Sequence, residues 1–351
     1  DDLLQVMADA ITVGALANMN ELLLSSNQIS DPGMVSLSNA IAKGALPSLK
    51  FLWLTSNKIA DEGMVAFAEA LKPNPSMPMG ALANLEKLWL NDNQIGDEGM
   101  AKFAEVLTPT PSNPKGSMGF LTELHLYENN IKDDGMIGFS DAISRGALAN
   151  LENLFLRNNQ IGNKGIVAFA DALRPNPSNP KGALPSLQGL HLQGNQIGDK
   201  GMVKFAEALK PNLSNPMGAL PRLKMLFLFQ NEIGITGMVS FADAIKPTPE
   251  NPMGAMGVLT ELQLWQNNIG DEGMKAFSDA ISKGALPSLQ TLNMSVNLGD
   301  DACARKALAE RGEEGGESES DDETRMCGCG RDGCPLCCLE GEAEGEEEEE
   351  D

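Results

Sequence analysis

Cysteine is nearly absent from the first 311 residues of this 351-residue chain. Cys303 is the single cysteine in that part. The other five cysteines lie beyond residue 325. A disulfide framework is therefore excluded for most of the chain, which favours a reducing compartment. No run of about 20 apolar residues occurs, so the sequence predicts no membrane span and no membrane partner.

Positive charge is also scarce, with 26 Lys and Arg against 49 Asp and Glu and a net charge of −23. Residues 312–351 account for −15 of this charge, with 17 acidic residues and two Arg, which leaves −8 for residues 1–311. A nucleic-acid-binding domain normally carries the opposite sign, so we expect no nucleic-acid partner.

Repetition, in contrast, runs through most of the chain. Units that start with Gly-Ala-Leu or a close variant follow one another at spacings of 30 or 36 residues. They begin at Gly14, Gly44, Gly80, Gly116, Gly146, Gly182, Gly218, Gly254 and Gly284. Repeats of this length predict a solenoid, which grows by adding units and needs no single large core.

The unit that starts at Gly80 shows what each repeat encodes. The L-x-x-L-x-L spacing of residues 85–90 predicts a short strand with one apolar face. Apolar residues at i, i+3, i+4 and i+7 in residues 100–107 predict a helix. Asp97 stands where the N-cap of that helix belongs. We expect the glycine of the segment IGDEG (95–99) to adopt a positive φ or to permit close packing.

Two columns of constant residues have a structural explanation. A Phe in each of seven helices is predicted to fill the core. An Asn follows every strand, where its side chain can donate to and accept from the backbone of a buried turn. The Asn column consists of Asn27, Asn57, Asn93, Asn129, Asn159, Asn195, Asn231, Asn267 and Asn297.

Five units carry six additional residues after the helix, for example KPNPSMPM at 72–79. Alternating prolines stop the helix and favour polyproline II. We expect these loops on one edge of the solenoid, as rigid spacers or as a second contact surface.

The pattern L-x-x-L-x-L-x-x-N-x-I-G-D-x-G followed by a helix resembles the leucine-rich repeat superfamily, and within it the ribonuclease-inhibitor-like class, as in NOD-like receptor repeat domains and Ran GTPase-activating proteins. The resemblance covers about residues 14–311. It implies an α/β horseshoe of nine repeats, with a parallel β-sheet on the concave face and α-helices on the convex face. Residues 1–13 are expected to be the end of a preceding repeat or an N-terminal cap helix. Residues 312–351 are expected to be a disordered acidic tail that contains cysteines.

The residues that vary lie between and just after the strand leucines, where side chains point away from the core. The middle position of L-x-L reads Leu23, Trp53, Trp89, His125, Phe155, His191, Phe227, Gln263 and Asn293. Two residues further the column reads Ser25, Thr55, Asn91, Tyr127, Arg157, Gln193, Phe229, Trp265 and Ser295. All three Trp, both His and the only Tyr fall in these two columns, although aromatic residues make up only 5% of the chain.

Aromatic residues and Arg are typical anchors of protein interfaces. The predicted protein-binding residues are Phe51, Trp53, Trp89, His125, Tyr127, Phe155, Arg157, His191, Phe227, Phe229 and Trp265. The alternative interpretation is that rings on neighbouring strands stack and stabilise the sheet, and both can hold at once.

The sequence predicts no catalytic residues, no cofactor and no metal site in the repeats. His125 and His191 lie two strands apart, roughly 10 Å, which is too far for one metal ion. In the acidic tail, Cys327, Cys329, Cys334 and Cys337 could hold zinc, but no apolar segment surrounds them, so the favoured prediction is no defined site.

The sequence therefore predicts a monomeric, non-catalytic scaffold that binds a protein partner on its concave surface. The expected location is the cytoplasm, with a nuclear or perinuclear site as the alternative. The alternative function is a GTPase-activating regulator of a small Ran-like GTPase. It rests on the resemblance of repeats plus acidic tail to Ran GTPase-activating proteins, and Arg157 is the only Arg in the two variable columns.

Overall fold

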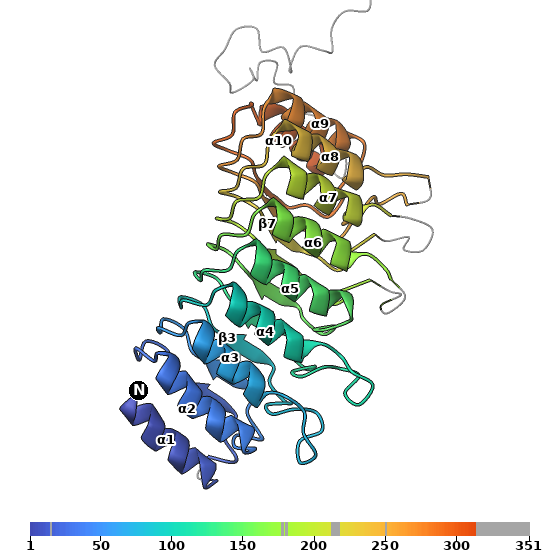
Figure 1. The fold of residues 1–351 in the computed structure, drawn as a ribbon. Coiled ribbons are helices and arrows are strands. Elements are labelled where there is room, and N and C mark those ends of the chain that lie inside the picture. The colour runs from blue at the N-terminus through green and yellow to red at the C-terminus, as the bar shows by residue number, and fades with distance from the viewer. Residues whose placement is uncertain (15, 177–178, 180–181, 212–217, 250, 314–351) are drawn as a thin grey trace, which may run out of the picture.

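Each repeat folds as a short strand, a turn, a helix and a return segment, and successive repeats stack into a curved solenoid (Figure 1). The computed structural model describes residues 1–14, 16–176, 179, 182–211, 218–249 and 251–313. None of the helices in this described part is long and apolar enough to cross a lipid bilayer.

The strands are three residues long. They are β1 (Glu21–Leu23), β2 (Phe51–Trp53), β3 (Lys87–Trp89), β4 (Glu123–His125), β5 (Asn153–Phe155), β6 (Gly189–His191), β7 (Met225–Phe227), β8 (Glu261–Gln263) and β9 (Thr291–Asn293). The helices are α1 (Asp2–Thr12), α2 (Asp31–Ala42), α3 (Asp61–Ala70), α4 (Asp97–Leu107), α5 (Asp133–Ser144), α6 (Asn163–Leu173), α7 (Asp199–Leu209), α8 (Ile235–Ile245), α9 (Asp271–Ser282) and α10 (Ala302–Glu313).

The nine strands form one parallel sheet in sequence order, from β1 to β9, and the helices cover one face of it. Pairing is in register, so that the central leucine of each strand lies beside the next, as Leu88 does beside Leu124. These leucines and the helix phenylalanines are buried between sheet and helices, and the rings of Phe67 and Phe103 stack at 6.3 Å. The predicted α/β solenoid is confirmed.

The Asn column forms the predicted ladder between repeats. Asn93 Oδ1 accepts a hydrogen bond from the amide of Ile59 at 3.0 Å, and its Nδ2 donates to the carbonyls of Leu54 and Leu90 at 3.0 and 3.1 Å. The same pattern recurs from Asn57 to Asn267. Each buried turn is therefore satisfied by the side chain of the following repeat.

A second ladder involves the Asp or Asn that begins most of the helices, and it corrects a sequence prediction. Asp97 does not cap α4, whose N-cap is Gly96 and lacks a side-chain cap bond. Instead, Asp97 Oδ1 accepts hydrogen bonds from the amides of Lys132 and Gly135, both at 2.8 Å, at the start of α5. The capping chemistry was predicted correctly, but the side chain caps the next repeat. The residues that cap in this way are Asp31, Asp61, Asp97, Asp133, Asn163 and Asp199.

This ladder also explains the glycines of the segment IGDEG. Gly96 has a φ of −104°, so the expectation of a positive φ is wrong there. A Cβ added to Gly99 would lie 2.7 Å from Asp61 Oδ1 and 2.9 Å from Met64 Cβ, so close packing is the reason for glycine. Positive φ occurs instead at the repeat start, for example at Gly80 with 84°.

The described parts of the proline-containing loops lie along one edge of the solenoid, on the right in Figure 1. The described loops turn back sharply, because the backbones of Asn74 and Met77 exchange two hydrogen bonds of 3.0 Å. Thr110 and Asn113 pair in the same way. The predicted polyproline II conformation is therefore interrupted by a turn in these two loops.

At the N-terminal end, α1 packs on α2 and joins the second ladder. Asp1 Oδ1 accepts from the amide of Ser30 at 3.0 Å, as Asp31 Oδ1 does from Ala60 at 2.7 Å. The boundaries 1–13 and 14–311 remain predictions. The expected tail lies outside the described residues, apart from the end of α10.

Candidate protein-binding surface

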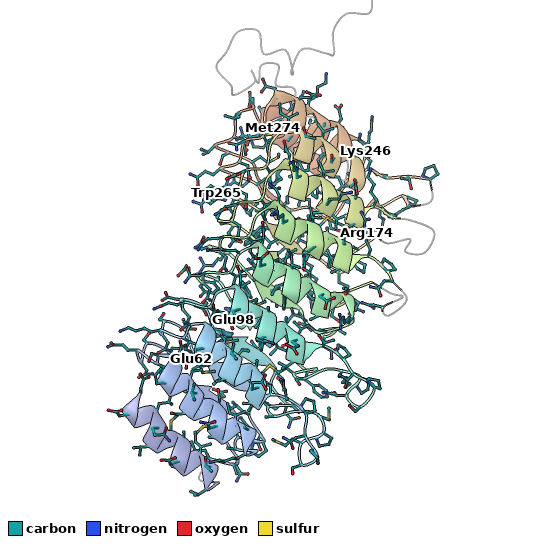
Figure 2. The ribbon with its side chains drawn as sticks, in the orientation of Figure 1. Glu62, Glu98, Arg174, Lys246, Trp265 and Met274 are labelled. Carbon is teal, nitrogen blue, oxygen red and sulfur yellow. The ribbon has the colours of Figure 1, made fainter. Side chains whose placement is uncertain are left out.

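All eleven predicted binding residues lie on the face of the sheet that points away from the helices. They alternate along each strand with leucines that are fully buried against the helices, such as Leu52 and Leu88. The register places Trp53 beside Trp89, then His125, Phe155, His191 and Phe227 on successive strands. Figure 2 labels Trp265, at the left edge, opposite Arg174 and Lys246.

The rings make one continuous row of contacts from β2 to just after β8, some stacked and others tilted or edge-on, which we call the aromatic band. Ring-centroid distances are 5.3 Å for Trp53–Trp89, 4.5 Å for Trp89–His125, 4.1 Å for His125–Phe155, 4.2 Å for Phe155–His191 and 4.6 Å for His191–Phe227. The band continues through Phe227–Phe229 at 6.3 Å and Phe229–Trp265 at 4.3 Å. The structure thus brings the rings together, as the stacking interpretation predicts.

Glu123 anchors the centre of the aromatic band. Its carboxylate accepts hydrogen bonds from Trp89 Nε1 at 3.1 Å and from His125 Nε2 at 2.7 Å, and forms an ion pair with Lys87 at 3.0 Å. The hydrogen bond from His125, with help from Lys87, lowers the pKa of Glu123 to about 2 although partial burial opposes the shift. Glu123 was not among the predicted binding residues, but its position two residues before His125 already places both side chains on the same face.

The two histidines lie within the aromatic band and are less accessible than their neighbours. His125 is 9% exposed and His191 is 8% exposed, whereas the other nine predicted residues are partly exposed. Burial, together with the nearby His125 and Arg157, lowers the pKa of His191 to about 4, so this ring is neutral at pH 7. Both histidines therefore hold neighbouring rings in place and offer little area to a partner.

Phe155 lies between the two histidines, with its ring centroid 4.1 Å from that of His125 and 4.2 Å from that of His191. Among the described residues, no three His, Cys, Asp or Glu side chains are grouped as a metal site would require. The predicted alternative zinc ligands, Cys327, Cys329, Cys334 and Cys337, lie outside the described residues.

Arg157 and Lys87, the two cations beside the aromatic band, each contact an aromatic ring and a carboxylate. The Arg157 guanidinium lies 3.9 Å from the centre of the Tyr127 ring and 3.6 Å from the Glu128 carboxylate. Lys87, besides its bond to Glu123, lies 5.9 Å from the centre of the Phe51 ring. Each cation therefore stabilises an aromatic side chain of the surface.

Three buried polar atoms on this face have no hydrogen-bond partner among the described residues. They are Trp53 Nε1, His125 Nδ1 and Gln193 Oε1. Leaving such an atom without any hydrogen bond costs roughly 1–3 kcal/mol, so a water molecule or a bound partner would be expected to satisfy it. Gln193, 5% exposed and in the column of Arg157 and Phe229, was not among the predicted binding residues, and only its position in the column pointed to it.

Comparison with known families identifies the repeats. The family model described as "Leucine Rich repeat" matches seven segments, at residues 15–38, 45–68, 81–104, 120–140, 147–170, 183–206 and 258–278. With the parallel sheet and the Asn ladder, these matches show that the chain belongs to the leucine-rich repeat superfamily. A search of curated proteins finds no match.

Solved structures with a similar chain path include a plant ice-binding protein and a TLR13–ssRNA13 complex. The first is 19% identical, with a TM-score of 0.37, and the match covers 81% of this chain and 66% of the other. The second is 18% identical, with a TM-score of 0.40, and covers 84% of this chain and 35% of the other. This chain therefore spans less than two thirds of each structure.

Proposed function

We propose that this leucine-rich repeat protein is a non-catalytic scaffold that binds a protein partner on the aromatic band of its concave surface. Leucine-rich repeats in general serve as protein-binding scaffolds. The observation that carries the proposal is the unbroken band of rings from Trp53 to Trp265, all of them partly exposed except the two histidines.

The size of the aromatic band fits a protein interface. It crosses seven strands, which at about 4.8 Å per strand gives a length of roughly 30 Å. A patch of that length supports an interface of ordinary size. A small molecule would occupy only a fraction of it, so a protein partner accounts for more of the observed surface.

The rigidity of the aromatic band also favours binding. Trp89 is held by Glu123, by the stacked ring of His125 and by the tilted ring of Trp53. Tyr127 is held by Arg157. Side chains that are already fixed lose little entropy when a partner arrives. Trp89 and Phe155 are partly exposed near the middle of the repeats, where interface energy concentrates.

The alternative function, activation of a small Ran-like GTPase, requires a residue that reaches into the partner's active site. Arg157 was the pointer to it. Its guanidinium is occupied by Tyr127 and Glu128, and it would have to give up both contacts. The geometry therefore favours a scaffold without a catalytic arginine. We further propose that the scaffold is monomeric and works in the reducing cytoplasm, in keeping with its scarcity of cysteine.

The test is affinity capture with the full chain as bait, compared with a bait carrying Trp89→Ala and Phe155→Ala. Proteins retained by the parent but not by the double variant identify the partner. A bait with Ile137→Ala, an exposed residue on α5, is the control and should retain the same proteins. If the double variant retains the parent's full set, the concave-surface proposal is wrong. The alternative, a GTPase-activating function, would be supported if the parent accelerates GTP hydrolysis by any of a panel of small GTPases and Arg157→Ala does not.

A further inference from the structure

The indole nitrogen of Trp53 differs from that of Trp89, although both residues hold the same position in consecutive repeats. The two side by side rings have centroids 5.3 Å apart and planes that differ by 33°. Trp89 Nε1 donates a hydrogen bond of 3.1 Å to Glu123. Trp53 Nε1 is buried and has no hydrogen-bond partner among the described residues. The aromatic band therefore holds one satisfied and one unsatisfied copy of the same donor.

The difference follows from one residue on the next strand. Glu123 begins its segment of β4, one strand after Trp89, and Lys87 holds the same place on β3, one strand after Trp53. A carboxylate accepts hydrogen bonds, whereas an ammonium group has three donors and no acceptor. Lys87 therefore cannot satisfy the indole of Trp53 in the way that Glu123 satisfies the indole of Trp89.

Lys87 keeps donors to offer after its contacts within the protein. Its ammonium lies 3.0 Å from Glu123 Oε2 and 5.9 Å from the centre of the Phe51 ring, and 39% of its side chain is exposed. Because an ammonium has three N–H groups, a second carboxylate can still bind to it. The indole N–H of Trp53 and the ammonium of Lys87 thus come from adjacent strands, and both are suited to the same acceptor.

We propose that the partner of the aromatic band places a carboxylate, from an Asp or Glu side chain, between Trp53 and Lys87. One oxygen accepts from Trp53 Nε1, as Glu123 does from Trp89, and the negative charge pairs with Lys87. Charge-assisted hydrogen bonds of this kind are roughly twice as strong as neutral ones. A backbone carbonyl would satisfy only the indole, whereas a carboxylate accounts for both groups. This inference rests on the proposed function, because it assumes a partner on the aromatic band.

Trp53 Nε1 is covered in the free protein, so a neighbouring side chain has to move when the carboxylate arrives. Lys87 is suited to this movement, because its side chain is flexible and partly exposed. It can bridge the carboxylates of Glu123 and of the partner, which then share one cation. Glu123 also shows that a carboxylate in this position leaves the rings in contact, since Trp89 and His125 remain stacked at 4.5 Å.

The chain itself contains a second source of carboxylates, since nine of the twelve residues 340–351 are acidic. Residues 312–351 contain no Phe, Trp or Tyr, however, and so offer no ring to the aromatic surface around Trp53. Between β2 and β9 there are also seven strand spacings, roughly 34 Å, which the segment would have to cross. A folded partner that covers the aromatic band brings its carboxylate to the site without this crossing.

The first test titrates the full chain with sodium acetate and follows the indole Hε1 signals of its three tryptophans by NMR. We expect the Trp53 signal to move downfield, because its N–H gains a charged acceptor, while the signals of Trp89 and Trp265 stay in place. Acetamide and sodium chloride at the same concentrations should move none of the three signals. Lys87→Met should reduce the shift of Trp53 at a given acetate concentration by at least half.

The carboxylate proposal is wrong if acetate leaves the Trp53 signal in place, or if acetamide moves it as far as acetate does. A full-length variant in which Asn and Gln replace the acidic residues of 340–351 tests the chain itself as the source. If the Trp53 signal of this variant differs from that of the parent before acetate is added, the acidic segment occupies the site and the proposed partner carboxylate is wrong.

The second test measures the affinity of the partner that capture identifies. Trp53→Phe keeps a ring and removes the donor, and Lys87→Met keeps the length of the side chain and removes its charge. Each should weaken binding at least about tenfold, which is about 1.4 kcal/mol. Lys58→Met, at an exposed position after β2, is the control and should bind like the parent. Thermal unfolding should show a smaller loss for Trp53→Phe than for Trp89→Phe, which also breaks the bond to Glu123.

The two proposals fail in different ways. If Trp53→Phe and Lys87→Met bind the partner like the parent, while the variant with Trp89→Ala and Phe155→Ala does not bind it, the carboxylate inference alone is wrong. If that double variant retains the parent's full set of captured proteins, the proposed function itself is wrong. Equal losses of thermal stability in Trp53→Phe and Trp89→Phe would show that Trp53 Nε1 is already satisfied, which also overturns the carboxylate inference.

Discussion

Single asparagines connect neighbouring repeats in this protein, and Asn159 shows how much one side chain does. Its Oδ1 accepts from the amide of Ile131 at 3.1 Å, and its Nδ2 donates to the carbonyls of Leu126 and Leu156 at 2.9 and 3.1 Å. We predict that Asn159→Ala lowers the free energy of unfolding by about 1–3 kcal/mol, because buried backbone groups lose their partner. The adjacent, exposed Gln160→Ala should change it by less than about 0.5 kcal/mol. Urea unfolding of both variants is the measurement, and equal effects would contradict a stabilising ladder.

The ladder of helix-initial acids is interrupted at one residue, and this suggests a stabilising substitution. Ile235 begins α8 where most other helices have Asp or Asn, so it cannot accept from the amides of Gly270 and Gly273 at the start of α9. Ile235 is 41% exposed, so its replacement removes little buried surface. We predict that Ile235→Asp stabilises the fold by about 0.5–2 kcal/mol, the usual value of a helix cap.

Thr236→Asp is the matched control for this substitution. It adds the same charge one residue later in α8, where it does not occupy the ladder position. Thermal and urea unfolding should show a larger gain for Ile235→Asp than for Thr236→Asp. A gain of equal size would mean that charge at the helix start, and not capping of the next repeat, is responsible.

For single residues, the hydrogen-bonding chemistry of the two ladders could be predicted from the sequence, but not always the backbone groups to which their side chains bind. The Asn ladder could be predicted because asparagine recurs at every turn, whatever surrounds it. The role of Asp97 could not, because spacing within a repeat does not say which repeat supplies the amides. Glu123 and Gln193 were missed for a related reason. The role of Glu123 depends on Trp89 on the neighbouring strand, and Gln193 is notable because its Oε1 has no hydrogen-bond partner among the described residues. Neither feature is encoded within a single repeat.

Strands β3 and β4 carry a charged network around Glu123, whose pKa is shifted far below its usual value. The folded-state pKa of Glu123 is about 2, below the usual value of 4.5, so its contribution to stability is fully present above about pH 4.5. That contribution is lost as the pH falls toward 2. We predict that Glu123→Gln costs on the order of 2–3 kcal/mol at pH 6 and much less at pH 3.

Urea unfolding at the two pH values measures this difference directly. Glu98→Gln, on the exposed surface of α4 and labelled in Figure 2, is the control and should show little difference at either pH. A cost of Glu123→Gln that is the same at pH 3 as at pH 6 would show that the carboxylate charge is not what holds Trp89 and His125.

For the whole molecule, the repeat period predicted the architecture almost completely. Nine strands, their parallel order and the position of the helices follow from the pattern of leucines, because stacked units of one kind can only pair with their neighbours. The position of the eleven candidate residues on the sheet face that points away from the helices follows from the same alternation. The continuity of the aromatic band did not, since it depends on which side chains meet across neighbouring strands.

Calorimetric titration shows whether the aromatic band is the binding surface. The captured partner is titrated into the full chain and into the variant with Trp89→Ala and Phe155→Ala. Removing two central anchors should cost at least about 2 kcal/mol each, which takes binding beyond detection. Thermal unfolding of the variant should stay within a few degrees of the parent, because both rings are partly exposed and the buried core is untouched. If the variant unfolds like the parent and binds the partner with the parent's affinity, the aromatic band is not the binding surface.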